Sequence, residues 1–158
     1  MNLAQLHLAF NHIPMMGLGF GLMVLVYGLI RRSADVQRAA LLVFLLAALA
    51  VFPAYLTGDG AADVIKGLPD ISEQRIEQHE DAAVTAQVMM ILVGLATLGG
   101  LYLLHKQKSL KVIASVSILA LSVISLLVML YTASLGGKIH HPELRAGYVV
   151  PAEVEDGD

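Results

Sequence analysis

Five of the six histidines in this chain lie in three short polar stretches that are separated by long apolar segments. They are His7, His12, His79, His140 and His141. Imidazole is a ligand that suits haem iron, copper and zinc. Carboxylates accompany the histidines, and Glu80 directly follows His79. These residue types predict a cofactor or metal site, provided that the fold brings the three stretches together.

The apolar segments predict a membrane protein. The 158 residues are 57% hydrophobic and only 15% charged, whereas about a quarter of a soluble domain is charged. Each apolar block is close to the ~20 residues that cross a bilayer core as a helix. We therefore expect an all-α, integral membrane four-helix bundle with the lipid bilayer as its first partner. A net charge of −3 argues against nucleic-acid binding.

The predicted transmembrane domain covers residues 1–148, with spans at approximately 12–31, 39–57, 84–104 and 111–135. The acidic segment 149–158 is predicted to be a flexible tail. Ser72 is a good N-cap, and the helical pattern runs from there to about residue 104. This helix is predicted to extend beyond the bilayer on one side. It presents His79 and Glu80 on the stripe that faces the bundle.

Proline and glycine predict two local features of the other helices. Pro14 removes a backbone donor inside the first helix, so we expect a kink there. Three glycines follow at alternate positions, Gly17, Gly19 and Gly21. They indicate either close helix packing or room for a flat cofactor. The last helix is predicted to end at the pair of glycines at 136–137, which would let the chain fold back over the bundle.

Basic residues predict the orientation in the membrane. Two short loops, 31–38 and 105–111, contain six of the ten basic residues and one acid, whereas the other side holds twelve of the thirteen acids. The positive-inside rule places those loops in the cytoplasm and both termini on the outer, periplasmic side. We therefore expect a multi-pass protein of the bacterial inner membrane. His105 then lies at the inner face, apart from the other five histidines.

The predicted site lies at the outer mouth of the bundle. We expect His12, His79 and His141 to approach one another there, with His7 as a fourth candidate and Glu80 as a ligand or as a partner of a ligand. Each histidine also has an ordinary interpretation. An interfacial His12 can cap a neighbouring carbonyl, and His79 or the pair at 140–141 can be surface residues. The cofactor interpretation depends on their convergence.

Four segments of the chain resemble a known group of proteins. They are LHLAFNHIP, YLTGDGAADV, IEQHEDAA and LGGKIHHPELR. Together they resemble a family of small bacterial four-helix membrane proteins of uncharacterised function, some relatives of which are fused to Rieske-type iron–sulfur domains. The matching positions are His7, His12, Pro14, Thr57, Gly58, His79, Gly136, Gly137 and His141. The resemblance implies electron transfer, with a redox protein or a larger membrane complex as partner, and it favours His141 over His140.

Three functions follow from these observations. The first is a membrane-embedded redox protein that binds b-type haem through His7, His12, His79 and His141, with a basic residue such as Arg145 beside the haem propionates. The chain has no cysteine, which excludes thiolate metal sites and covalent c-type haem. The second is a non-haem copper, zinc or iron site formed by His12, His79, His141 and Glu80. The third is a cofactor-free assembly subunit. No catalytic nucleophile or base is identifiable.

Overall fold

The computed structural model describes residues 2–107 and 110–149, and their structure is almost entirely helical. The helices are α1 (Leu3–Phe10), α2 (His12–Ile30), α3 (Ala34–Leu56), α4 (Gly58–Ile65), α5 (Glu73–Gln107) and α6 (Val112–His140), followed by the short 3-10 helix η1 (Pro142–Leu144). The predicted tail lies almost wholly outside the described residues. The predicted all-α class is confirmed.

Four helical segments in the described part of the chain are long and apolar enough to cross a membrane: Leu3–Ile30, Ala34–Ile65, Glu73–Gln107 and Val112–His140. Their outer surfaces carry large exposed apolar side chains. Leu46 is 67% exposed, Leu95 61% and Ile113 82%. A soluble monomer rarely exposes apolar surface on this scale, so the four segments fit a multi-pass membrane protein whose outer faces contact lipid.

Helix α5 confirms the expectation of one long helix that carries His79. It begins at Glu73 and runs for 35 residues without interruption. At 1.5 Å per residue this helix is about 50 Å long, which exceeds the ~30 Å of a bilayer core. His79 therefore lies on a rigid helix, in its second turn.

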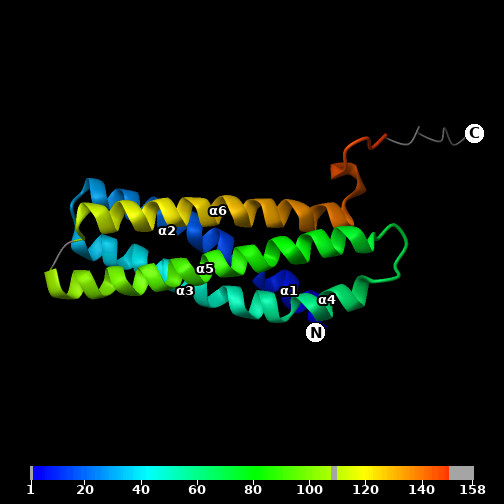
Figure 1. The fold of residues 1–158 in the computed structure, drawn as a ribbon, viewed down its shortest axis with the longest axis horizontal. Helices are drawn as coiled ribbons and strands as arrows, with labels where there is room; N and C mark the ends of the chain where they lie inside the picture. The colour runs from blue at the N-terminus through cyan, green and yellow to red at the C-terminus, as the bar shows by residue number, and fades with distance from the viewer. Residues whose placement is uncertain (1, 108–109, 150–158) are drawn as a thin grey trace, which may run out of the picture.

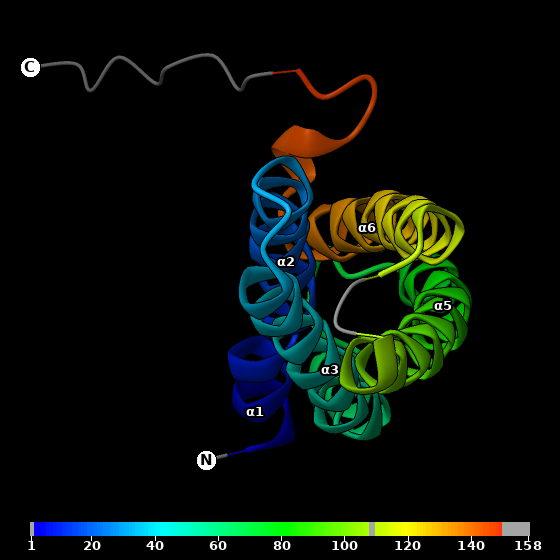
Figure 2. The same cartoon turned by 90° about the vertical axis from the view of Figure 1, so that its left-hand side faces the viewer.

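The first span is interrupted near Pro14, as expected. Helix α1 ends at Phe10 and α2 begins at His12, with Asn11 between them. Proline has no backbone N–H, and its ring clashes with the carbonyl four residues earlier, which here belongs to Phe10. The interruption lets α1 leave the line of α2 and pack on α3 and α4. Figure 2 shows α1 displaced from the axis of α2.

The four long helices form a ring in the order α2, α3, α5, α6 (Figure 2). Glycines set the close contact of α2 with α3. A Cβ at Gly17 would lie 2.6 Å from the Ala47 Cβ, and a Cβ at Gly21 would lie 2.5 Å from ring carbons of Phe44. A Cβ at Gly19 would meet nothing within 4 Å. Gly17 and Gly21 therefore make room for α3, which supports close helix packing over space for a cofactor.

The expectation that the last helix ends at Gly136 and Gly137 is wrong. Helix α6 continues through both glycines to His140, and the chain turns at His141, where the backbone leaves the helical region before Pro142. The Arg145 guanidinium bonds the carbonyls of Lys138 and Ile139 at the end of α6, so a side chain and not a glycine caps this helix.

The two ends of the bundle differ in their chain connections (Figure 1). The α2–α3 connection and the facing ends of α5 and α6 lie at one end, which carries the basic segments. The α4–α5 connection and the last described residues lie at the other end, and α1 lies in the same half of the molecule. This second end holds the five histidines, and we call it the histidine end.

Candidate functional site

A cavity of about 420 Å³ opens within the bundle at the histidine end. All six helices contribute to its wall. Most of the lining side chains are apolar or small, for example Met15, Val51 and Ala86. The polar exceptions include all five clustered histidines, together with Asn11, Asp59, Glu80 and Thr132. An apolar cavity with a few convergent polar groups is the usual form of a cofactor or ligand site.

His7 is fixed to the wall of this cavity by one ring nitrogen. Its Nδ1 lies 2.9 Å from the carbonyl oxygen of Ala54, in the last turn of α3. The last four carbonyls of a helix lack intrahelical partners, which leaves this oxygen free to accept. A carbonyl only accepts hydrogen bonds, so Nδ1 carries the proton and donates. The Thr57 hydroxyl shares its proton between the Pro53 carbonyl, at 2.8 Å, and the Ala54 carbonyl, at 3.1 Å.

His79 is also held by a hydrogen bond from its Nδ1 to a backbone carbonyl, on the side of the cavity formed by α5 and α6. Its Nδ1 donates to the carbonyl oxygen of Thr132, in α6, at 3.0 Å. The Thr132 hydroxyl shares its proton between the Val128 carbonyl in its own helix, at 3.0 Å, and the Ala82 carbonyl, at 3.2 Å. The second contact joins α6 to α5 beside the histidine. Gly136 makes the approach possible, because a Cβ there would lie only 3.0 Å from the His79 Cε1.

The two rings lie close together across the cavity. Their centroids are 6.3 Å apart, and their planes meet at 89°. Because each Nδ1 proton is donated to a backbone carbonyl, each neutral ring keeps its Nε2 lone pair free. An imidazole whose Nδ1 is held by a carbonyl is the usual form of a metal-bound histidine. The pair can therefore accept a Lewis acid or a proton.

The geometry around Gly136 gives a prediction with a matched control. Alanine normally stabilises a helix interior by about 0.8–1.0 kcal/mol relative to glycine. At Gly137 the new Cβ would meet only the Leu144 Cδ1, at an ordinary 3.6 Å, so Gly137→Ala should show this gain. Gly136→Ala should fall short of it by about 1 kcal/mol, because the His79 ring must move and weaken its hydrogen bond. Unfolding midpoints in detergent measure both changes, and equal gains would contradict the contact.

The other predicted residues line the same cavity but differ in their exposure to solvent. His12, His140 and His141 are exposed, whereas His7, His79 and Glu80 are half-buried. Within the described residues, no three side chains of histidine, aspartate or glutamate are close enough to hold one metal ion. The structure thus gathers the four residues predicted for a non-haem site around one cavity without bringing three of them to one point. His105 is exposed near the other end of α5.

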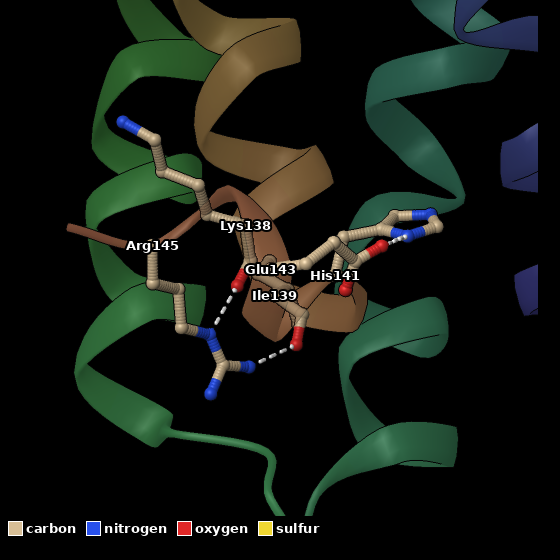
Figure 3. Close-up of polar contacts among 5 residues, drawn as sticks. All are labelled: Lys138, Ile139, His141, Glu143 and Arg145. Carbon is tan, nitrogen blue, oxygen red and sulfur yellow. Dashed lines mark hydrogen bonds and ion pairs between the residues drawn. The ribbon is translucent and has the colours of Figure 1, made fainter. Parts of the chain in front are cut away.

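His141 pairs with a carboxylate and not with His7 or His79. Its Nδ1 lies 2.8 Å from Glu143 Oε1 (Figure 3). Both side chains are more than half exposed. The backbone N–H of Glu143, and then His141, lower the pKa of the Glu143 carboxyl. Exposed pairs of this kind contribute little to stability.

Arg145 is already engaged by backbone carbonyls. Its Nε donates to the Lys138 carbonyl, and one terminal nitrogen donates to the Ile139 carbonyl (Figure 3). The same terminal nitrogen also donates to the Asp70 carbonyl. This side chain therefore ties the segment after α6 to the α4–α5 connection. The predicted role beside a haem propionate would compete with these three bonds.

Sequence reasoning missed the two carbonyls that hold the rings. Backbone oxygens of Ala54 and Thr132 have no signature of their own, and Thr132 lies in an apolar run that is typical of an ordinary span. A signal did exist in the glycines. Gly58 and Gly136 each follow their carbonyl by four residues, and at Gly136 a Cβ would lie only 3.0 Å from the His79 ring.

Comparisons with known protein families, with curated proteins and with solved structures find no match to this chain. The resemblance to small four-helix membrane proteins therefore stays an expectation, and the geometry of the cavity is the main guide to function.

Proposed function

We propose that this chain is a membrane-embedded redox protein that binds b-type haem in the cavity at its histidine end and transfers electrons. The observation that carries the proposal is the pair formed by His7 and His79. Both rings have Nδ1 fixed on a backbone carbonyl, which leaves Nε2 as the unprotonated nitrogen. Both residues line one cavity. Four-helix bundles hold cofactors in their cores through side chains on facing helices.

The spacing of the rings fits two ligands of one iron. Imidazoles that bind a metal ion from opposite sides at about 2.0 Å place their centroids about 6.3 Å apart. The observed separation is 6.3 Å. The angle of 89° between the planes is also compatible, because each ring can take any rotation about its bond to the metal. This favours His7 over His12 and His141 as the partner of His79.

The remaining cavity wall suits a porphyrin in its chemistry. A volume of about 420 Å³ lies in the range of cofactor sites, and small and apolar residues line most of it. Haem supplies one-electron chemistry when bound. The chain would hold its iron with His7 and His79 and orient both rings through the carbonyls of Ala54 and Thr132. The apolar wall would limit the access of water, which tunes the reduction potential.

The orientation of the protein is part of the proposal. We infer that the histidine end faces the periplasm of a bacterial inner membrane, because the basic segments 31–38 and 105–111 belong to the opposite end. Alkaline phosphatase fused to the C-terminus should be active, and green fluorescent protein fused there should be dark. The reverse pattern would place the site in the cytoplasm.

The absorption spectrum of the gently purified protein tests the proposal. We expect a Soret band and sharp α and β bands after reduction with dithionite, as two imidazole ligands give, and metal analysis should find about one iron per chain. Copper or zinc without haem would support the non-haem alternative. A protein that lacks both haem and metal, and that does not bind added haemin, would leave the assembly subunit as the function.

A further inference from the structure

The ring of four helices consists of two similar halves. Helices α2 and α3 form one antiparallel hairpin, and α5 and α6 form the other. Between the hairpins, α3 packs on α5 and α6 packs on α2. A twofold rotation about the bundle axis would exchange α2 with α5 and α3 with α6, and it would preserve all four contacts. Figure 2 looks along this axis.

The histidine contacts follow the same symmetry. In each half, a histidine near the start of the first span donates Nδ1–H to a carbonyl near the end of the second span. The two residues of each contact are 47 and 53 positions apart in the sequence. In each half a glycine, Gly58 or Gly136, stands four residues after the accepting carbonyl and faces the ring of its histidine.

The first span of each half also has a similar order of residue types, although the spacings differ by two or three positions. Each histidine is followed by a pair of methionines and then by a tyrosine near the other end of the same span. In the first half these are Met15, Met16 and Tyr27, and in the second half they are Met89, Met90 and Tyr102. The first span differs by its interruption at Asn11, whereas α5 is continuous.

We propose that the chain is a repeat of one helical hairpin, and that His7 and His79 are equivalent halves of one site on the pseudo-twofold axis. Such a site takes a Lewis-acidic centre with two equivalent open positions on opposite faces. The assignment of that centre to haem iron rests on the proposed function. The site then has two equal imidazole ligands and does not combine one strong ligand with a weak one.

Equivalence has a measurable consequence. If both histidines bind the iron from equivalent positions, the loss of either one should leave the same five-coordinate, high-spin haem. A one-sided site would respond differently, because loss of the weak ligand would change little and loss of the strong ligand would release the haem.

The experiment compares His7→Gly and His79→Gly in the full chain, purified in detergent and titrated with haemin. We expect both variants to bind haemin more weakly than the natural chain and to show matching high-spin spectra. Added imidazole should restore the six-coordinate spectrum in both, because it can occupy the vacated space and donate to the exposed carbonyl. A natural spectrum in either variant, or rescue in only one, would overturn the equivalence.

Further variants distinguish a wrong pair of ligands, an unfolded variant and a chain that binds no haem. His105→Gly, near the other end of α5 and outside the cavity wall, should keep the six-coordinate spectrum. A high-spin spectrum in His12→Gly or His141→Gly would show that a different pair binds the iron. If a glycine variant does not fold, glutamine at the same position keeps an N–H donor for the carbonyl and provides the same comparison. If the natural chain binds no haemin, the proposed function fails and the assignment of the ligand fails with it. Unequal effects in a chain that binds haemin refute the equivalence alone.

Discussion

Replacing His79 by alanine should lower the affinity for haemin by more than about 100-fold, since the loss of a residue that merely orients a ligand already costs about 10–100-fold. The chain should still enter the membrane. The ring lies at the cavity wall and contributes no apolar core, whereas the buried contacts of α5 come from residues such as Met90 and Val93. The cofactor and the fold should therefore respond separately to this substitution.

Haemin titration followed by the Soret band measures this loss, and size-exclusion chromatography in detergent reports the fold. His105→Ala on the same helix is the matched control, because its exposed side chain lies near the other end of α5. It should change neither readout. His12→Ala tests which histidine is the partner of His79. Natural affinity in that variant supports the pair with His7, whereas a loss equal to that of His79→Ala would make His12 a ligand of the iron.

The general architecture could be predicted from the sequence because membrane helices follow simple rules. Apolar length gives the spans, and the uninterrupted pattern after Ser72 gives α5, which begins at Glu73 as expected. The interruption near Pro14 follows from the missing backbone donor. These features depend on local chemistry, and so a single sequence reveals them.

The choice between His7 and His12 could not be predicted in the same way. On an unbroken helix the two side chains would point in directions about 140° apart, so only one of them could face a given point. The direction in which α1 bends at Asn11 decides between them, and that direction is set by its packing on α3 and α4. Tertiary contacts of this kind leave no periodic signal in α1.

The end of α6 shows why a local rule failed. Paired glycines commonly follow a helix, because they accept the left-handed conformation that closes it. Here Gly136 stays helical and instead leaves space for the His79 ring, whose Cε1 would lie 3.0 Å from a Cβ. A missing side chain serves a turn and a close approach equally well, so the sequence alone did not distinguish the two uses.

The contact between Gly21 and Phe44 should give the largest change in stability. The Phe44 side chain is fully buried and has no room to move, and ring carbons already lie 2.5 Å from a Cβ built at Gly21. Gly21→Leu should therefore destabilise the bundle by about 3 kcal/mol or more, since α2 must move away from α3. Unfolding by sodium dodecyl sulfate, followed by circular dichroism, measures this change.

Two further variants test whether the contact is the cause. Gly19→Leu lies on the same helix, where a Cβ meets nothing within 4 Å, and it should be neutral or slightly stabilising through helix propensity. Phe44→Ala alone should cost about 3–5 kcal/mol. Combined with Gly21→Leu, it should cost clearly less than the sum, because leucine can fill the space that the phenyl ring leaves. Additive losses, or equal losses for leucine at positions 19 and 21, would show that α2 and α3 do not meet through these residues.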